Sequence, residues 1–182
     1  MTDLFLQAGF FLLKSLAQFL SILLLMRFFM QLFRVSFNNQ VGTFVVQLTN
    51  WAVLPLRRVL PGVFGLDLSS LLPAYLLQAI VLFAALSLQT GLTVLMPGSL
   101  VVEILFGSLL ALLRTSIYLL IGLLILQAVL SWVNPYSPIN RPINQITQVF
   151  LGPIRRVVPP IANIDLSPLI AILLAQVVLI FV

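Results

Sequence analysis

The amino-acid sequence predicts an all-α membrane protein with four transmembrane helices. We expect these helices to form two parallel tandem repeats of a helical hairpin, each with an amphipathic, re-entrant-like cytoplasmic loop. Composition is the first reason: of 182 residues, 62% are hydrophobic and 7% are charged, and the mean hydropathy is +1.21. A soluble domain carries about 25% charged residues, so a soluble fold could not cover this much apolar surface. The second reason is a set of polar residues that recurs after 98 positions, between apolar runs.

Four apolar runs are the predicted spans, because crossing a bilayer requires roughly 20 residues. They cover residues 8–33, 70–88, 104–133 and 167–182. Lys14 and Arg27 lie toward the two ends of the first run, where long side chains can extend to the headgroups. The last run is roughly 24 Å long as a helix, so we expect either a thinned bilayer or an upright helix there. The N-terminus lacks a basic region and a clear cleavage site, so the first run is expected to stay in the membrane.

Basic residues gather in the two long connections between spans. The net charge of +5 comes from nine basic residues, eight of which are arginines. By the positive-inside rule, both long connections are cytoplasmic and both termini lie on the opposite side. In a membrane protein this charge favours orientation and contact with anionic lipid rather than nucleic acid. The arginines of the two connections are Arg34, Arg57, Arg58, Arg141, Arg155 and Arg156.

The sequence predicts an internal duplication into a first repeat, residues 1–90, and a second repeat, residues 91–182, whose matched positions lie 98 residues apart without a gap. Apolar matches mean little in such a chain, so matched polar residues and prolines indicate the duplication. Each half holds two spans, so both halves would enter the membrane in the same direction, as parallel repeats do. The matched pairs include Thr49 and Thr147, Pro55 and Pro153, Arg57 and Arg155, Arg58 and Arg156, Pro61 and Pro159, Asp67 and Asp165, Ser69 and Ser167, and Gln78 and Gln176.

An amphipathic helix is predicted before each arginine pair, because apolar residues fall there at helical spacing. Such a helix lies either in the membrane interface or against the cytoplasmic end of the bundle, and the sequence favours neither. The apolar residues are Phe44, Leu48, Trp51 and Ala52 in the first half, and Ile143, Ile146, Val149 and Phe150 in the second.

The motif Pro-x-Arg-Arg-x-x-Pro follows each amphipathic helix. Its prolines, Pro55 and Pro61 or Pro153 and Pro159, are expected to bracket a single helical turn. Guanidinium groups suit phosphate through paired hydrogen bonds, so the arginines are predicted to dock anionic lipid or an acidic partner. The alternative is that they only set the topology or neutralise a nearby aspartate. The arginines concerned are Arg57, Arg58, Arg155 and Arg156.

An Asp-Leu-Ser segment ends each connection. We expect Ser167 to be the N-cap of the last span, with Pro168 as its first helical residue. Asp165 is expected to accept backbone N–H bonds or to pair with an arginine of its own loop. Asp67 and Ser69 would act in the same way in the first half. A catalytic or ion-coupling carboxylate is the alternative.

Polar side chains are predicted within the spans: Gln78, Gln176 and Arg114 are the main ones, and Gln18, Gln89 and Gln127 add to the polar content. Gln78 and Gln176 suit hydrogen bonds between helices, and a polar pathway is the alternative. Arg114 is the deepest plausible charge, and an ionisable residue within a span is a functional hypothesis by default.

The chain contains no His and no Cys, and its four carboxylates are Asp3, Asp67, Glu103 and Asp165. This composition excludes disulfides, thiolate nucleophiles and His-based acid–base pairs. Zinc and haem also lose their usual ligands. We therefore expect no enzymatic activity, no metal and no cofactor.

The tandem motif resembles the YggT family of bacterial membrane proteins. The segment SWVNPYSPINRPINQITQVFLGPIRRVVPPIANIDLSPLI, residues 131–170, is similar to a full copy of the family repeat. The first copy, residues 34–72, departs from it: Arg34 stands where the second copy has Trp132, and SFNNQVG replaces NPYSPIN. The resemblance implies a multi-pass protein of the bacterial cytoplasmic (inner) membrane.

The resemblance also implies processes in which relatives take part. These are division-site and membrane organisation, cytochrome b6 maturation and nucleoid distribution in plastids, and osmotic or potassium stress. Without Cys or His, a haem-related role would be that of a scaffold. We expect a non-enzymatic organiser or assembly factor whose loops dock anionic lipid or a membrane protein complex. The alternative is a small channel or transporter in ion or osmotic homeostasis, forming an oligomer or pseudo-dimer with a path lined by Gln78, Gln176 and Arg114.

Overall fold

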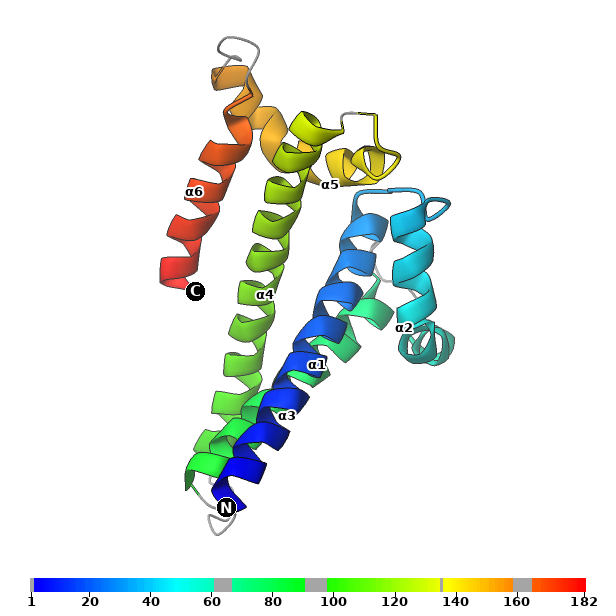
Figure 1. The fold of residues 1–182 in the computed structure, drawn as a ribbon. Helices are drawn as coiled ribbons and strands as arrows, with labels where there is room; N and C mark the ends of the chain where they lie inside the picture. Colours follow the sequence, from blue (N-terminus) through cyan, green and yellow to red (C-terminus); the bar gives the residue numbers. More distant parts are fainter. Residues whose placement is uncertain (1, 61–66, 91–97, 135, 159–164) are drawn as a thin grey trace.

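The computed structural model describes residues 2–60, 67–90, 98–134, 136–158 and 165–182. These residues form six α-helices and no strand (Figure 1). The helices are α1 (Thr2–Leu32), α2 (Gln40–Val59), α3 (Leu68–Thr90), α4 (Gly98–Val133), α5 (Asn140–Val157) and α6 (Ser167–Phe181). The predicted all-α class is therefore confirmed.

Three of the six helices are long and apolar enough to cross a membrane. The apolar stretches are Leu4–Leu32 in α1, Leu68–Leu88 in α3 and Leu100–Ser131 in α4, and they coincide with the first three predicted spans. Helix α6 is also apolar, but its 15 residues extend only roughly 22 Å. Its crossing of the bilayer therefore stays a prediction.

Helix α1 ends in a compact hydrogen-bonded turn. Arg34 has a φ of 54°, the left-handed conformation that closes many helices and usually belongs to glycine. The N–H of Val35 donates to the carbonyl of Met30 over 2.8 Å, and the N–H of Arg34 donates to that of Gln31 over 3.1 Å. This pair of bonds satisfies carbonyls at the helix end and reverses the chain toward α2.

Helix α2 begins at a defined cap. The side chain of Asn39 accepts the backbone N–H of Gly42 over 2.8 Å, as N-cap asparagines do. Gly42 itself faces the backbone of Phe37, whose oxygen would lie 2.5 Å from an added Cβ atom. A residue with a side chain could not occupy this position without moving the turn.

The hydrophobic core lies where helices of the two halves meet. One cluster joins α1, α2, α4 and α5 through residues such as Met30, Val45, Leu123 and Ile146. A second joins α1, α2, α3 and α4, and a third joins α4, α5 and α6. Helices α2 and α3 both pack against α1, whereas α5 and α6 both pack against α4.

The connections from α1 to α2 and from α4 to α5 lie at the same end of the molecule, opposite the N-terminus (Figure 1). Helices α1 and α4 run in the same direction toward that end. The segments that carry the two arginine pairs therefore follow helices that point the same way.

The apolar stripe that the sequence marks on α2 is exposed, and a different face of the helix is buried. Gly42, Val45, Thr49 and Val53 are the buried residues of this helix. Phe44, Leu48 and Trp51 point outward instead, and Trp51 keeps 66% of its surface exposed. In α5, by contrast, the predicted residues Ile143 and Ile146 are buried, while Val149 and Phe150 are exposed. An apolar outer stripe on α2 suits contact with lipid rather than water.

Candidate functional site

Two elbows carry the polar residues that the sequence singles out. The first elbow comprises residues 55–60 and 67–70, at the end of α2 and the start of α3. The second comprises residues 153–158 and 165–168, at the end of α5 and the start of α6. Within the described residues, these elbows contain both of the ion pairs that the structure shows.

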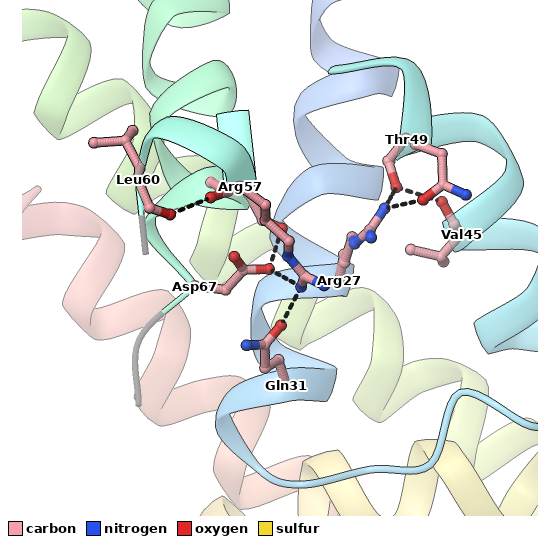
Figure 2. A network of polar contacts seen from close by, with 10 residues as sticks. Arg27, Gln31, Val45, Thr49, Arg57, Leu60 and Asp67 are labelled. Carbon is pink, nitrogen blue, oxygen red and sulfur yellow. Dashed lines mark hydrogen bonds and ion pairs between the residues drawn. The ribbon is translucent and has the colours of Figure 1, made fainter. Parts of the chain in front are cut away.

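The first elbow is closed by an ion pair between Arg57 and Asp67. Arg57 Nη2 lies 2.7 Å from Asp67 Oδ2 and also donates to Gln31 Oε1 of α1 over 2.7 Å (Figure 2). The hydroxyl of Ser70 donates to the same Asp67 oxygen over 2.7 Å. The Asp67 side chain is only 3% exposed, so these donors replace the water that a buried carboxylate loses.

Arg27 of α1 lies buried beside this elbow. Its Nη1 donates to Thr49 Oγ1 over 2.7 Å and to Asn50 Oδ1 over 3.0 Å, both on α2 (Figure 2). The Thr49 hydroxyl in turn donates to the carbonyl of Val45. Arg27 is 4% exposed, so the expected extension of its side chain to the headgroups is wrong. Hydrogen bonds within the protein hold the guanidinium inside instead.

Sequence reasoning missed this role of Arg27. A signal for it exists in α2, where Thr49 lies at helical spacing from Val45 and Val53 on one buried face, with Asn50 next to it. A polar residue on an apolar face needs a partner. Only the packing of α2 against α1 shows that Arg27 is that partner.

The second elbow repeats the ion pair with a more exposed aspartate. Arg155 Nη2 lies 2.8 Å from Asp165 Oδ2, and Arg155 Nε donates to the same oxygen over 2.9 Å. Asp165 Oδ1 accepts the backbone N–H of Ser167 over 2.9 Å. The Asp165 side chain is 39% exposed. The expected pairing of Asp165 with an arginine of its own loop and with a backbone N–H is therefore what the structure shows.

The pKa of Asp165 lies below its ordinary value of 3.8. Partial burial acts in the opposite direction, because it disfavours the charged carboxylate. Hydrogen bonds from Ser167 and from the Arg155 guanidinium, together with the Arg155 charge, outweigh this effect and lower the pKa. Asp165 is therefore an ionised acceptor at neutral pH and not a proton donor.

The second arginine of each pair lies free of acidic residues. Arg58 and Arg156 are exposed, and neither forms an ion pair with a described residue. The division is the same in both elbows. The first arginine fixes the turn through its aspartate, and the second presents an uncompensated guanidinium at the surface.

The prolines lie differently from the sequence expectation. Pro55 is inside α2 and Pro153 is inside α5, so the arginines belong to the last turns of long helices rather than to a separate braced turn. The backbone N–H groups of Leu60 and Val158 close these ends, with bonds of 2.7 and 2.8 Å to residues four positions earlier. The predicted roles of Pro61 and Pro159 fall outside the described residues.

The serines after the aspartates also differ in role. The N-cap residue of α6 is Leu166, and Ser167 is the first helical residue, so the expectation that Ser167 is the N-cap is wrong. Asp165 acts from two residues earlier by accepting the Ser167 N–H. In the first elbow the Ser69 hydroxyl donates to the carbonyl of Leu60 over 3.1 Å and so ties the start of α3 to the end of α2.

A polar cluster joins three helices inside the apolar bundle. Gln78 of α3 donates to Gln18 of α1 and to Thr115 of α4, in each case over 3.4 Å. Gln18 also donates to Thr115 over 3.3 Å. Gln78 is buried, so this contact fits the expected hydrogen bond between helices.

The other two intramembrane residues do not join Gln78. Gln176 on α6 and Arg114 on α4 are exposed, and neither belongs to the cluster of Gln18, Gln78 and Thr115. The three residues that the channel hypothesis requires along one path therefore do not line a common interior. Arg114 faces the surroundings of the bundle rather than a partner helix.

The chemistry available at the elbows is electrostatic. Asp67 and Asp165 are each held by the arginine of their own elbow, and no three His, Cys, Asp or Glu residues gather among the described residues. Exposed guanidinium groups bind phosphate and carboxylate through charge-assisted hydrogen bonds. The elbows are therefore suited to holding an anion.

Comparison with known proteins places this chain in a family. The CCB3/YggT family model matches residues 6–89 and 106–182. The uncharacterised protein YggT of Escherichia coli K12 is 36% identical over 92% of this chain and 85% of its own length. An uncharacterised Pseudomonas aeruginosa protein is 33% identical over 91% of this chain and 83% of its own.

A further relative, an uncharacterised protein of Vibrio alginolyticus, is 33% identical over 88% of this chain and 85% of its own length. No solved structure matches the chain significantly. The family model covers most of both halves, and the relatives cover nearly the whole chain, with apolar helices that suit a membrane. The chain belongs to the CCB3/YggT family of helical membrane proteins.

Proposed function

We propose that this chain is a non-enzymatic organiser of the bacterial cytoplasmic membrane whose two elbows dock anionic lipid headgroups. One observation carries the proposal. In both elbows an aspartate binds the first arginine, which leaves Arg58 and Arg156 exposed and without an acidic partner among the described residues. Helices α1 and α4, which precede the helices that carry the two arginine pairs, run toward the same end of the bundle (Figure 1).

The surroundings of the first elbow support contact with a membrane surface. Phe44, Leu48 and Trp51 are exposed on α2, and tryptophan favours the depth of the lipid headgroups. An exposed arginine near such a surface contributes about 1 kcal/mol of attraction to anionic lipid. Positive charge at both elbows also favours the cytoplasmic side for them and the opposite side for both termini.

The proposal includes the finer architecture that the sequence predicts. The two halves would be tandem parallel hairpins, with α2 and α5 as their amphipathic helices and α6 as a fourth span. The elbows support it, because the ion pairs measure 2.7 and 2.8 Å and join residues ten positions apart in both halves. A crossing by α6 requires a locally thinner bilayer, since roughly 22 Å is shorter than the usual hydrocarbon thickness.

A lipid-binding measurement tests the proposal. Native mass spectrometry of purified protein, given equal amounts of anionic and zwitterionic lipid, reports which lipid stays bound. The double variant Arg58→Gln/Arg156→Gln should lose anionic lipid by about tenfold or more, because two surface charges are removed. The matched control, Lys14→Gln/Arg114→Gln, removes the same charge from predicted spans and should keep the lipid.

Two further results would decide the outcome. The charge-preserving variant Arg58→Lys/Arg156→Lys should retain most of the binding, since the surface attraction depends chiefly on charge. Unchanged anionic-lipid binding in the glutamine variant would contradict the proposal, and so would reporter fusions that place Arg58 and Arg156 on opposite sides of the membrane.

A further inference from the structure

A polar cavity of about 260 Å³ lies between α4 and α5, beside the second elbow. Its lining consists of Gln127, Ser131, Asn140, Asn144, Gln148 and Arg155. Three other cavities of the molecule have linings that are almost wholly apolar, as expected for surfaces that face lipid chains. The cavity between α4 and α5 is suited to a different ligand, one that forms hydrogen bonds.

The cavity lies where the apolar stretch of α4 ends. The apolar stretch of α4 ends at Ser131, and Gln127 and Ser131 belong to its last two turns. Polar side chains at the end of a membrane-spanning helix meet the zone where the hydrocarbon gives way to headgroups. A ligand in this cavity could therefore remain attached to acyl chains in the bilayer.

The lining offers hydrogen bonds that the protein itself leaves unused. The side chains of Asn144 and Gln148 have no hydrogen-bond partner among the described residues. Arg155 binds Asp165 through Nε and Nη2, and its Nη1 has no acceptor in the described part of the chain. Primary amides both donate and accept, whereas a guanidinium only donates.

This set of groups fits an anion that carries hydroxyls. The guanidinium suits a phosphate oxygen, and the amides suit hydroxyl groups, which also donate and accept. None of the six lining residues is a carboxylate, and Asp165 is engaged by Arg155. An ammonium group in the ligand would therefore find no opposite charge in the lining.

The first half of the molecule lacks the equivalent cavity lining. At positions 98 residues earlier, Phe29 and Phe33 stand in place of Gln127 and Ser131. Gly42 and Val46 stand in place of Asn140 and Asn144. The rings of Phe29 and Phe33 stack with centroids 6.0 Å apart. Asn50, which corresponds to Gln148, is bound by Arg27. The unpaired amides of Asn144 and Gln148 thus have no unpaired counterpart at the matching positions of the first half.

We propose that this cavity selects the phosphoglycerol headgroup of an anionic phospholipid, as in phosphatidylglycerol. The proposal rests on the lipid docking proposed for the elbows and names the lipid class and the residues that select it. A cavity of about 260 Å³ has the volume of about eight or nine water molecules, enough for a group of about ten non-hydrogen atoms. Arg155 holds the phosphate, and Asn144 and Gln148 hold the glycerol hydroxyls.

A competition between two lipids of equal net charge tests the selection. The purified protein is mixed with equal amounts of phosphatidylglycerol and phosphatidylserine, and native mass spectrometry reports the bound ratio. The wild type should retain phosphatidylglycerol by about fivefold to tenfold, as expected for one or two additional hydrogen bonds. The variant Asn144→Leu/Gln148→Leu should bind both lipids about equally and keep its total anionic lipid.

A matched control uses the same helix. Gln145 is exposed on α5 and does not line the cavity, so Gln145→Leu should keep the preference for phosphatidylglycerol. Equal binding of the two lipids by the wild type would overturn the cavity assignment but leave the docking by Arg58 and Arg156 intact. Loss of all preference for anionic over zwitterionic lipid would instead remove the proposed function and this inference together.

A soluble ligand is distinguished by thermal stability in detergent. Short-chain phosphatidylglycerol should raise the unfolding temperature of the wild type more than that of Asn144→Leu/Gln148→Leu. Glycerol 3-phosphate, which carries the same polar group without acyl chains, should have little effect at the same concentration. Equal stabilisation by glycerol 3-phosphate would overturn the lipid assignment in favour of a free phosphate ester.

Discussion

The two elbows hold the same ion pair in different surroundings. The Arg–Asp distances are 2.7 and 2.8 Å, and both arginine side chains are 41% exposed. Yet Asp67 is 3% exposed, whereas Asp165 is 39% exposed. The motif thus fixes the pairing within each loop but does not fix how deeply the aspartate is buried.

The difference comes from the helix beside each elbow. In the first half, α1 contributes Gln31, which binds Arg57, and Arg27, which binds α2. At the corresponding positions α4 has Val129 and Ile125, two apolar residues that are exposed. Helix α1 therefore packs on the first elbow through hydrogen-bonding side chains. Helix α4 has no such side chains at the matching positions, and the second elbow is less covered. The first elbow is therefore the more buried of the two, and the aspartate of the second stays partly exposed.

Removing the first arginine of each pair should give the largest difference in stability between the two elbows. Arg57→Gln leaves the buried Asp67 without its cation, and we expect a loss of about 2 kcal/mol in the free energy of unfolding, less than the roughly 3–5 kcal/mol of a fully buried pair because Arg57 is partly exposed. Arg155→Gln should cost about 0–1 kcal/mol, as for a surface ion pair. Titration with SDS in mixed micelles measures both values.

A second substitution checks the cause of that effect. If the cost of Arg57→Gln arises from an unpaired buried carboxylate, then adding Asp67→Asn should recover part of the stability in a double-mutant cycle. The same cycle with Arg155 and Asp165 should give a coupling near zero. Equal coupling in both elbows would show that the burial of Asp67 has no energetic consequence.

The comparison also applies to the matched glutamines Gln78 and Gln176, for which we expect a smaller change in the free energy of unfolding. Gln78→Leu removes the contacts with Gln18 and Thr115, and we expect a loss of roughly 0.6 kcal/mol, the average for hydrogen bonds between membrane helices. Gln176→Leu should leave the unfolding free energy unchanged, because Gln176 is exposed on α6. A larger loss at Gln176 than at Gln78 would contradict the packing of these helices.

The smallest expected effect is a dependence on acidity at the second elbow. Because the folded-state pKa of Asp165 lies below 3.8, the ionised carboxylate stabilises the fold above the unfolded-state pKa. This contribution is lost as the pH falls below about 4 and through the folded-state pKa. The unfolding temperatures of wild type and Asp165→Asn are compared from about pH 6 down to about pH 3, a range that includes the ordinary pKa of Asp. The difference between the two proteins should shrink toward the acidic end. A difference that grows on acidification would contradict the assignment.

Much of the fold follows from patterns that are local in the chain. The apolar runs predicted α1, α3 and α4 because bilayer thickness sets the length of a spanning helix. The spacing of apolar residues predicted the helix α5 with Ile143 and Ile146 on its apolar face, and left open whether that face meets lipid or the bundle. On α2 the same spacing marked Phe44, Leu48 and Trp51, which face outward because contact with α1 and α3 buries another face of the helix.

The sequence by itself determined the class of the protein, its long apolar helices and the Arg–Asp pairs, which join residues ten positions apart in the chain. These features depend on composition and on short stretches of backbone. The tertiary structure alone decided that Arg27 is buried, that Asp67 is covered while Asp165 is exposed, and that Asn144 and Gln148 line a polar cavity. Each of these depends on which side chains a distant helix brings to the site, and no local pattern specifies that packing.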